Sequence, residues 1–316
     1  MGVASIKQQV NYVLDHMDKT AKEGPERSRH EAKRLNIAHR GIYSINSRRS
    51  VQKRCLAMLR SLPPELKVRR LADLTPAHIA WAVDNMKTNG RAGATIKSHL
   101  SAYRKLQQGI ADRGWSKRAP EELVPDHLYD GLVRRDPRGP YSGAVADRIT
   151  EHLSHHPRWG TDFVQMCRLA RAAGLRRAEL VGLRQEDIDR TTGTITVRKT
   201  SAKGGKQRIV ELDPAGRVAL AAVLVTVPAD NPYIWFNGRT IAENLERNIR
   251  AFCQQQGFTC RGIHGFRATF ADEWLNRHLG DGPIARKQEQ VARRELSALM
   301  GHVRTQITYS YTPRRS

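Results

Sequence analysis

GLRRAEL, residues 174–180, directly follows a run from Phe163 to Ala173 whose apolar residues repeat with a helical period. Gly174 suits the position just after a helix, where glycine often adopts a left-handed conformation. A second helix is predicted to begin near Arg177. Arg176 then lies at the start of that helix, where a cation is mildly mismatched with the helix dipole.

A β-hairpin is predicted downstream of these two helices. Residues 193–199 (GTITVRK) and 207–212 (QRIVEL) alternate apolar or β-branched residues with polar ones, and the turn-forming stretch 202–205 (AKGG) separates them. Lys203 lies at the predicted tip. Helical patterns then return over residues 241–255, 266–275 and 289–299. The predicted fold class is therefore mainly α with a small antiparallel β-hairpin or sheet.

RRDPRGP, residues 134–140, is the predicted domain boundary. Two prolines and a glycine within this stretch cannot continue a helix, and its charges keep it solvated. A chain of 316 residues is also near the size at which single cores divide into two. We therefore predict an N-terminal region, residues 1–138, and a second domain, residues 139–316.

The N-terminal region is predicted to be a small basic helical bundle. Thr75 and Pro76 form a good helix start, a second amphipathic helix opens near Thr95, and a third surrounds residues 48–60. The basic residues of these helices are the candidate DNA contacts: Arg48, Arg49, Lys53, Arg54, Lys97, Arg104 and Lys105. A solvated charged face is the alternative for any one helix. We place the DNA-binding core at about residues 46–120 and read no motif in residues 1–45.

The charge balance favours a polyanionic partner. Lys and Arg total 54 and Asp and Glu total 31, so the formal net charge is +23. Nucleic acid leads as the partner, because no helix opposes a basic face to a Trp, Phe and Leu face of the membrane-binding kind. No apolar run approaches the roughly 20 residues that span a bilayer. We expect a soluble, cytoplasmic, nucleoid-associated protein.

Cysteine and histidine positions do not predict a metal site. The four cysteines are scattered and are expected to be reduced: Cys55, Cys167, Cys253 and Cys260. In EHLSHH, residues 151–156, the histidines have a ligand-like spacing, but no carboxylate or thiol joins them at a recognised interval. Cys253, Cys260 and His264 match no zinc-site spacing either. We predict no metal.

Four separated pieces carry residues suited to chemistry on a phosphodiester: GLRRAEL at 174–180, Lys203, HGFR at 264–267, and LMGH at 299–302 with Tyr311 nine residues later. A phosphodiester under attack develops about two negative charges, which preorganised donors stabilise. Guanidinium groups match that need, so Arg176 and Arg267 are the candidate clamp. A tyrosine hydroxyl, with an ordinary pKa of about 10, needs a strongly positive site or a base to act as a nucleophile. The cations that bind the phosphate would also serve this need.

In this order the four pieces resemble the catalytic domain of the tyrosine recombinases, the integrase family of phages and mobile elements. The resemblance covers about residues 141–312. It implies that Tyr311 is the nucleophile, with Tyr309 as a packing neighbour. It further implies that His264 is an acid/base or orienting group and that His302 donates to the scissile phosphate.

The remaining roles also follow from the resemblance. Glu179 would steady the site, and Lys203, for which Lys206 is the alternative, would protonate the leaving 5′ oxygen. The N-terminal bundle resembles the core-binding, SAM-like domain of the family. The implied partners are double-stranded DNA with specific recombination sites, three further protomers in a tetramer, and accessory DNA-bending factors.

The resemblance implies a site-specific recombinase that forms a covalent 3′-phosphotyrosyl intermediate and integrates or excises a mobile element. Because that link conserves the phosphodiester energy, neither ATP nor a metal cofactor is needed. A resolvase or type IB topoisomerase-like enzyme is the alternative within the same chemistry. A non-catalytic accessory DNA-binding protein and a metal-dependent transposase are the alternatives outside it.

The sequence departs from the family pattern in three places. Phe266 and Ala268 stand where leucine and histidine are frequent, which changes packing more than charge. Between Arg267 and His302 lie 34 residues, more than usual, with residues 276–290 as the excess. Five residues follow Tyr311, fewer than in the tail that many relatives dock on a neighbouring protomer.

Overall fold

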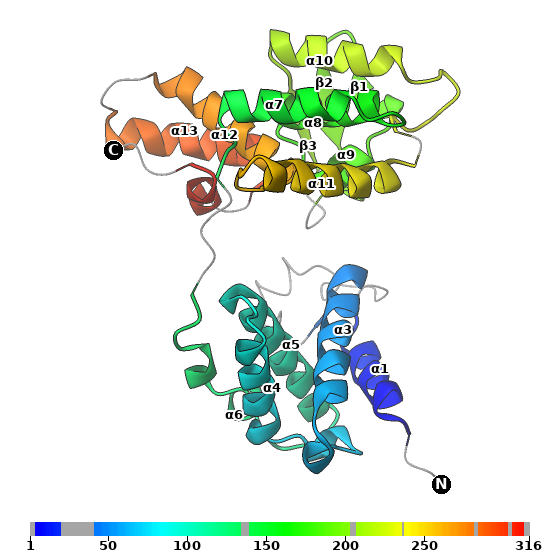
Figure 1. The fold of residues 1–316 in the computed structure, drawn as a ribbon, viewed down its shortest axis with the longest axis vertical. Helices are drawn as coiled ribbons and strands as arrows, with labels where there is room; N and C mark the ends of the chain where they lie inside the picture. Colours follow the sequence, from blue (N-terminus) through cyan, green and yellow to red (C-terminus); the bar gives the residue numbers. More distant parts are fainter. Residues whose placement is uncertain are drawn as a thin grey trace. The chain divides into compact units, whose positions relative to one another are not determined.

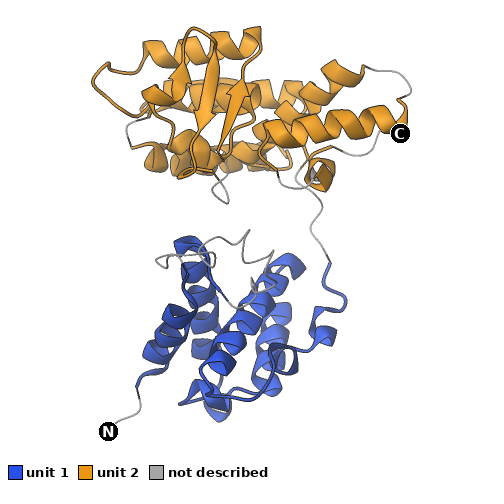
Figure 2. Ribbon diagram, turned by 180° about the vertical axis from the view of Figure 1, so that it is seen from behind, with its two compact units in different colours: residues 1–136 blue, residues 137–316 orange. Residues whose placement is uncertain are grey.

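A computed structural model describes residues 4–19, 41–133, 139–202, 207–235, 237–280, 284–302 and 305–312. The chain divides into two compact units, residues 1–136 and residues 137–316, shown in different colours in Figure 2. The division falls inside the RRDPRGP stretch. Each unit has its own buried apolar cluster and is described by itself.

The regular structure in the described part of unit 1 is helical, apart from an isolated bridge between Asp18 and Ile42. Its α-helices are α1 (Ile6–Met17), α3 (Ile45–Ser61), α4 (Pro76–Thr88), α5 (Gly93–Asp112) and α6 (Pro120–Leu123). Short 3₁₀ turns lie at η3 (Pro64–Leu66), η4 (Leu71–Asp73) and η5 (Asp126–Tyr129). Helix α4 begins after Thr75 and ends at Thr88, with Asn89 as its C-cap and Gly90 following with a φ of 64°, close to the end predicted near Asn89 and Gly90.

Helix α5 is the centre of unit 1. It packs against α1, α3, α4 and α6, and its predicted apolar face is buried. Helix α1, in a stretch without a readable motif, belongs to the same core through four buried side chains: Val10, Val13, Leu14 and Met17. At Gly109 of α5 a Cβ atom would lie 2.5 Å from the side chains of Val13 and Met17, so the glycine permits this close approach. The hydrophobic core of unit 1 therefore includes α1, which lies before residues 46–120, the predicted DNA-binding region.

Unit 2 is built around α8 (Gly160–Ala173), which contacts helices on several sides (Figure 1). The other helices are α7 (Gly143–Ser154), α9 (Arg177–Val181), α10 (Pro214–Val225), α11 (Gly238–Gln255), α12 (Ile263–Leu279) and α13 (Arg286–Leu299). Two 3₁₀ helices complete it, η6 (Gln185–Asp187) and η7 (Thr305–Ser310). Helix α8 ends at Gly174 with a φ of 58°, the left-handed conformation expected from the sequence.

A small antiparallel sheet lies beside these helices. Its strands, in the order β1-β2-β3, are β1 (Ile188–Asp189), β2 (Thr194–Val197) and β3 (Arg208–Glu211). Strands β2 and β3 pair with Ile195 opposite Val210, which places both of these buried residues on the inner face. The predicted hairpin and the predicted fold class, mainly α with a small antiparallel sheet, are confirmed. Strand β1 was not predicted.

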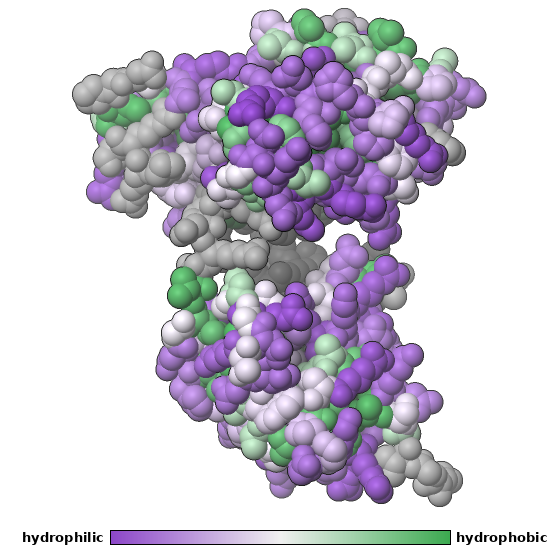
Figure 3. All heavy atoms as spheres, in the orientation of Figure 1, coloured by the Kyte–Doolittle hydropathy of each residue, from purple (hydrophilic) through white to green (hydrophobic). Residues whose placement is uncertain are grey.

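Helix α10 was also not predicted from the sequence. Asp213 caps it by accepting from the N–H of Gly216, and Pro214 is its first residue. Its apolar residues continue onto the outer face, where Val218 is 71% and Val225 86% exposed. Green spheres along α10 in Figure 3 mark this apolar edge of unit 2. A helix that is apolar on both faces shows no helical period, so periodicity could not reveal it.

Cysteines and histidines outside the site mostly serve packing. Cys55, Cys167 and Cys253 are buried, and Cys260 is exposed. The ring of His152 stacks on Phe252 with centroids 4.2 Å apart. In the described parts of the chain, no group of three or more potential metal-ligating side chains comes together, and no helix is both long enough and apolar enough to cross a bilayer.

Candidate active site

Arg176 lies at the junction between α8 and α9. The left-handed turn at Gly174 ends α8, and Arg176 is the residue immediately before α9. Its backbone N–H donates to Oε2 of Glu179 at 2.8 Å and its Nη1 donates to Oε1 at 2.7 Å. Its Nη2 donates to the carbonyl of Gly301 at 3.2 Å. The side chain is 16% exposed, so it is partly accessible.

Glu179 binds a second arginine that the sequence did not single out. Arg208, from β3, donates from Nη1 and Nη2 to the two carboxylate oxygens of Glu179 at 3.0 and 2.8 Å. Its Nε donates to the carbonyl of Leu299 at 2.9 Å. Burial alone would raise the pKa of Glu179, but hydrogen bonds from Arg208 and from the Arg176 N–H outweigh it and lower the pKa to about 2. Glu179 is therefore ionised.

A signal for Arg208 was present in the strand pattern. Side chains two residues apart share a face of a strand, and Val210 of β3 is buried. Arg208 therefore points to the inner face, where a cation needs a carboxylate partner. Within the hairpin, only Lys203 at the tip was a predicted site residue.

Arg267 is completely buried on α12. It donates to the carbonyl of Gly174, to the carbonyl of Met300 at 2.7 Å and to Nε2 of His302 at 3.0 Å. Its Nε has no hydrogen-bond partner among the described residues. Burial and the neighbouring Arg176 lower the pKa of Arg267 to about 10, so it stays protonated at neutral pH.

His302 follows the end of α13. Gly301, with a φ of 65°, turns the chain, and the His302 N–H donates to the carbonyl of Ser297 at 2.8 Å. Because Arg267 can only donate, Nε2 of His302 is an acceptor, which assigns the ring proton to Nδ1. Burial, with the charges of Arg267 and Arg176, lowers the pKa of His302 to about 3. The imidazole is therefore neutral near pH 7.

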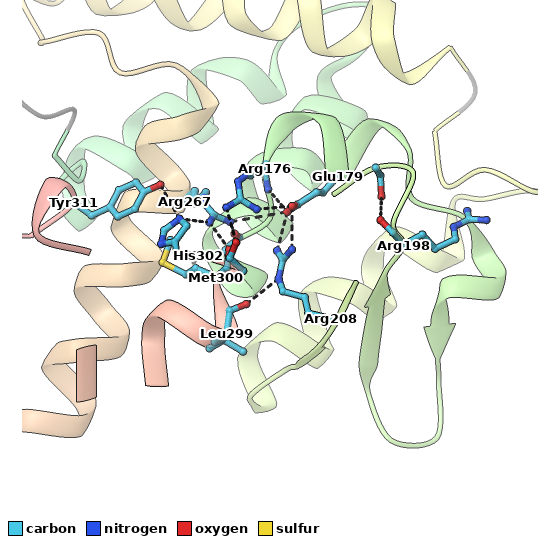
Figure 4. A network of polar contacts seen from close by, with 12 residues as sticks. Arg176, Glu179, Arg198, Arg208, Arg267, Leu299, Met300, His302 and Tyr311 are labelled. Atoms are coloured by element: carbon cyan, nitrogen blue, oxygen red, sulfur yellow. Dashed lines mark hydrogen bonds and ion pairs between the residues drawn. The ribbon is translucent and has the colours of Figure 1, made fainter. Parts of the chain in front are cut away.

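Tyr311 lies against both histidines. Its hydroxyl is 3.4 Å from Nε2 of His302, and the two rings stack with centroids 5.6 Å apart. The ring of His264 is 5.5 Å away. Tyr311 is 7% exposed, and Figure 4 shows its hydroxyl directed toward Arg267 and His302. Tyr309 instead lies against Arg293, whose guanidinium carbon is 4.0 Å from its ring centroid.

The structure gathers six of the predicted site residues from three of the four sequence pieces: Arg176, Glu179, His264, Arg267, His302 and Tyr311. Lys203 and its alternative Lys206 lie outside the described residues. Three guanidinium groups surround one carboxylate, which gives the site a net positive charge. Such a site can stabilise the charge that develops on an attacked phosphodiester and on a tyrosine oxygen.

The predicted DNA contacts of unit 1 fall into two groups. Arg48 pairs with Asp15, Arg104 donates to the Val124 carbonyl and to Asp126, and Lys105 donates to the Gly41 carbonyl. These three side chains thus have partners within the unit. Arg54 also has a partner, because it donates to Oγ of Ser50, and Arg49, Lys53 and Lys97 are exposed or partly exposed.

A tyrosine hydroxyl beside clustered guanidinium groups is an arrangement suited to cleaving and rejoining DNA strands. The model of the phage integrase family matches residues 146–315, more than half of the sequence, and the chain belongs to this family, the tyrosine recombinases. The membership expected from the sequence motifs is confirmed.

Two sequence relatives are tyrosine recombinases as well. The chain is 23% identical over 261 residues to the tyrosine recombinase XerC of Chlamydia pneumoniae, covering 75% of this chain and 73% of that protein. It is 31% identical over 154 residues to XerC of Rhodospirillum centenum, covering 44% of this chain and 38% of that one.

Solved structures show the same fold. A lambda integrase dimer bound to a COC′ core site has a TM-score of 0.63 at 15% identity, covering 91% of this chain and 96% of that chain. The Tn1549 transposon integrase in complex with a circular intermediate DNA has a TM-score of 0.62 at 16% identity, covering 90% and 95%.

Proposed function

We propose that the protein is a site-specific DNA recombinase that integrates or excises a mobile element through a covalent 3′-phosphotyrosyl intermediate on Tyr311. The observation that carries this proposal is the position of the Tyr311 hydroxyl, 3.4 Å from Nε2 of His302, an atom that also accepts from Arg267. A nucleophile and phosphate-binding cations thus share one site.

The proposed reaction conserves the phosphodiester. The Tyr311 oxygen bonds to phosphorus as its hydroxyl proton passes to a base, for which His264 is the candidate. The bond from phosphorus to the 5′ oxygen breaks, and that oxygen takes up a proton. Lys203, with Lys206 as the alternative, is the proposed donor. A 5′ hydroxyl of a partner strand then attacks the phosphotyrosine, so neither ATP nor a metal is required.

Arg176 and Arg267 are the proposed clamp on the scissile phosphate. Arg176 is partly exposed, and the buried Nε of Arg267 has no partner among the described residues, so both retain capacity to donate. The negative charge of an entering phosphate would raise the low pKa of His302 and favour its protonation. A protonated His302 could then donate to a phosphate oxygen, while Glu179 holds Arg176 in place.

Two related structures support a role in a mobile element and assembly as a tetramer on DNA. One neighbour is a transposon integrase on a circular intermediate DNA, and another is a lambda integrase tetramer bound to a Holliday junction. We extend both features to this chain, with double-stranded DNA carrying specific sites as substrate and four protomers in the synaptic complex. Accessory DNA-bending factors are further proposed partners, on the family resemblance alone.

A suicide-substrate trap tests the proposed function. Nicked duplexes from DNA flanking the coding sequence are incubated with the protein in EDTA, and a denaturant-resistant protein–DNA adduct is sought. The unaltered chain should form an adduct whose peptide contains Tyr311. Tyr311→Phe should bind the same DNA and form none, because it lacks the attacking oxygen while keeping the ring.

Tyr309→Phe is the matched control. It removes the other nearby hydroxyl but keeps the ring face against Arg293, so the adduct on Tyr311 should still form. An adduct formed by Tyr311→Phe would move the nucleophile elsewhere. Tight binding without any adduct from the unaltered chain would favour an accessory DNA-binding protein, and a requirement for a divalent metal would favour a transposase.

A further inference from the structure

Helix α13 contains a buried ion pair that the proposed reaction does not use. Arg293 is completely buried, and Glu289, one helical turn earlier, is 2% exposed. Both Nε and Nη2 of Arg293 lie 2.8 Å from Oε1 of Glu289. Replacing such a buried pair with apolar residues often costs no stability, so stability alone does not explain its presence.

The guanidinium of Arg293 also holds the segment that carries Tyr311. Its Nη1 donates to Oγ1 of Thr312 at 3.0 Å and to the Thr312 carbonyl at 3.3 Å. Its carbon lies 4.0 Å from the ring centroid of Tyr309. Arg293 therefore contacts the chain on both sides of Tyr311.

The backbone hydrogen bonds within the segment around Tyr311 are short-range. Helix η7 is a 3₁₀ helix of six residues, and the N–H groups of Tyr311 and Thr312 both bond to the Thr308 carbonyl. Hydrogen bonds of 3₁₀ type have poorer geometry than those of an α-helix. Arg293 on α13 adds a hydrogen bond that fixes the end of this short helix in place. Thr312 is 1% exposed, so water cannot replace Arg293 as the donor to its side chain and carbonyl.

We propose that Arg293, held in place by Glu289, is a positioning residue that presents the Tyr311 hydroxyl to the arginine cluster of its own chain. This inference rests on the proposed function. A displacement of about 1 Å in a reacting group can lower a rate by about 100-fold. Arg293 acts here through the Tyr311 segment, so its loss should slow attack by the tyrosine without weakening the phosphate clamp.

Two reactions at the same phosphate separate positioning from general damage. The first is adduct formation by Tyr311, followed in a single turnover at saturating DNA. The second is cleavage by hydrogen peroxide in a Tyr311→Phe background, in which the hydroperoxide anion attacks phosphorus in place of the tyrosine and the 5′ oxygen leaves. The second reaction needs the arginines and His302 but not the position of Tyr311.

The main variant is Glu289→Gln with Arg293→Met, which removes both charges and leaves neither buried ion unpaired. We expect adduct formation to fall by about 10- to 100-fold, with DNA affinity and peroxide cleavage within about twofold of the parent. Thr312→Val is a milder variant that keeps the ion pair and removes the hydroxyl contact. It should slow adduct formation several-fold, again without changing peroxide cleavage. Arg294→Met, at the exposed position next to Arg293, is the control for loss of charge on α13.

Several outcomes would overturn the inference. Equal adduct rates in the parent and in Thr312→Val and the double variant would show that the contacts do not position Tyr311. A parallel fall of adduct formation and peroxide cleavage would assign the pair a general structural role. Failure of the unaltered chain to form any adduct would overturn the proposed function, and this inference with it.

Discussion

Glu179 is one carboxylate among three guanidinium groups. It accepts hydrogen bonds from Arg176 and Arg208, and its Oε2 lies 4.0 Å from Nη1 of Arg267. One negative charge cannot neutralise three positive ones, so the excess acts on the neighbouring titratable groups. The pKa of His302, which accepts from Arg267, is lowered first by burial and then by these charges. Burial and the field that prepares the site for a phosphate thus together keep this imidazole neutral.

His302 should make the protein less stable as the pH falls. Its pKa is about 3 in the folded chain and about 6.5 when unfolded, so below pH 6.5 the unfolded chain binds a proton that the native chain does not. The free energy of unfolding should therefore decrease from about pH 6.5 toward pH 3, by up to about 1.4 kcal/mol per pH unit. Urea unfolding between pH 7.5 and pH 5 measures this slope.

His302→Gln is the comparison for that measurement. It retains a polar side chain that does not titrate, so its slope between pH 6.5 and pH 5 should be shallower than that of the parent. The contribution of Glu179, whose folded pKa is about 2, is lost only at lower pH, below its ordinary value. Identical slopes for the parent and His302→Gln would contradict the assignment of a buried neutral imidazole.

At the scale of elements, the turn after α8 connects the fold to the site. Gly174 ends the helix in a left-handed conformation, and its carbonyl accepts from Arg267. A Cβ atom at this position would lie 2.4 Å from Cδ1 of Phe270 on α12. The glycine thus allows α8 and α12 to meet closely enough for Arg267 to reach the turn.

Gly174→Ala should destabilise the protein more than a glycine replacement in open space. Gly257 follows α11 with a φ of 68°, and an added Cβ would have no atom within 4 Å. Gly257→Ala should therefore destabilise the protein only through the left-handed conformation, by about 1–2 kcal/mol. Gly174→Ala has the same backbone cost plus the clash with Phe270, about 1–3 kcal/mol more. Urea unfolding of the two variants tests this difference in the free energy of unfolding. Equal decreases would mean that Phe270 and α12 shift to accommodate the Cβ atom without loss of stability.

Local signals predicted most of these elements from the sequence. Thr75-Pro76 and Gly174 mark helix ends through their own backbone preferences, and the hairpin follows from alternation around a glycine turn. Helix α10 and strand β1 were missed because one is apolar on both faces and the other has two residues. The strand pattern places Arg208 on the inner face but does not identify Glu179 as its partner, 29 residues earlier in the sequence. The role of Arg293 depends on its contact with Thr312, 19 residues later, which local patterns do not reveal.

At the scale of the whole molecule, the chain combines a basic helical unit with a unit that carries the site. The formal net charge of +23 would attract DNA to both. In unit 1, Arg49 and Lys53 of α3 are exposed, whereas Arg104 and Lys105 make contacts within the unit. We therefore expect the outer face of α3 to contribute phosphate contacts.

Removal of residues 1–138 should weaken DNA binding and flatten its dependence on salt. Each phosphate contact contributes about 0.9 to the slope of log affinity against log salt concentration. Unit 2 has its own buried core, so the shortened chain should fold. Binding titrations at several salt concentrations compare the two chains. An unchanged slope would refute a DNA-binding role for unit 1.

The single exposed thiol offers a route to observing DNA engagement directly. Burial raises the pKa of Cys55 to about 12 and that of Cys253 to about 11, and it also raises the pKa of Cys167, so these three thiols are poor nucleophiles. Cys260 is exposed and lies four residues before His264. A maleimide fluorophore would therefore attach at one place beside the site, and the unaltered chain could report the arrival of its substrate by a change in emission.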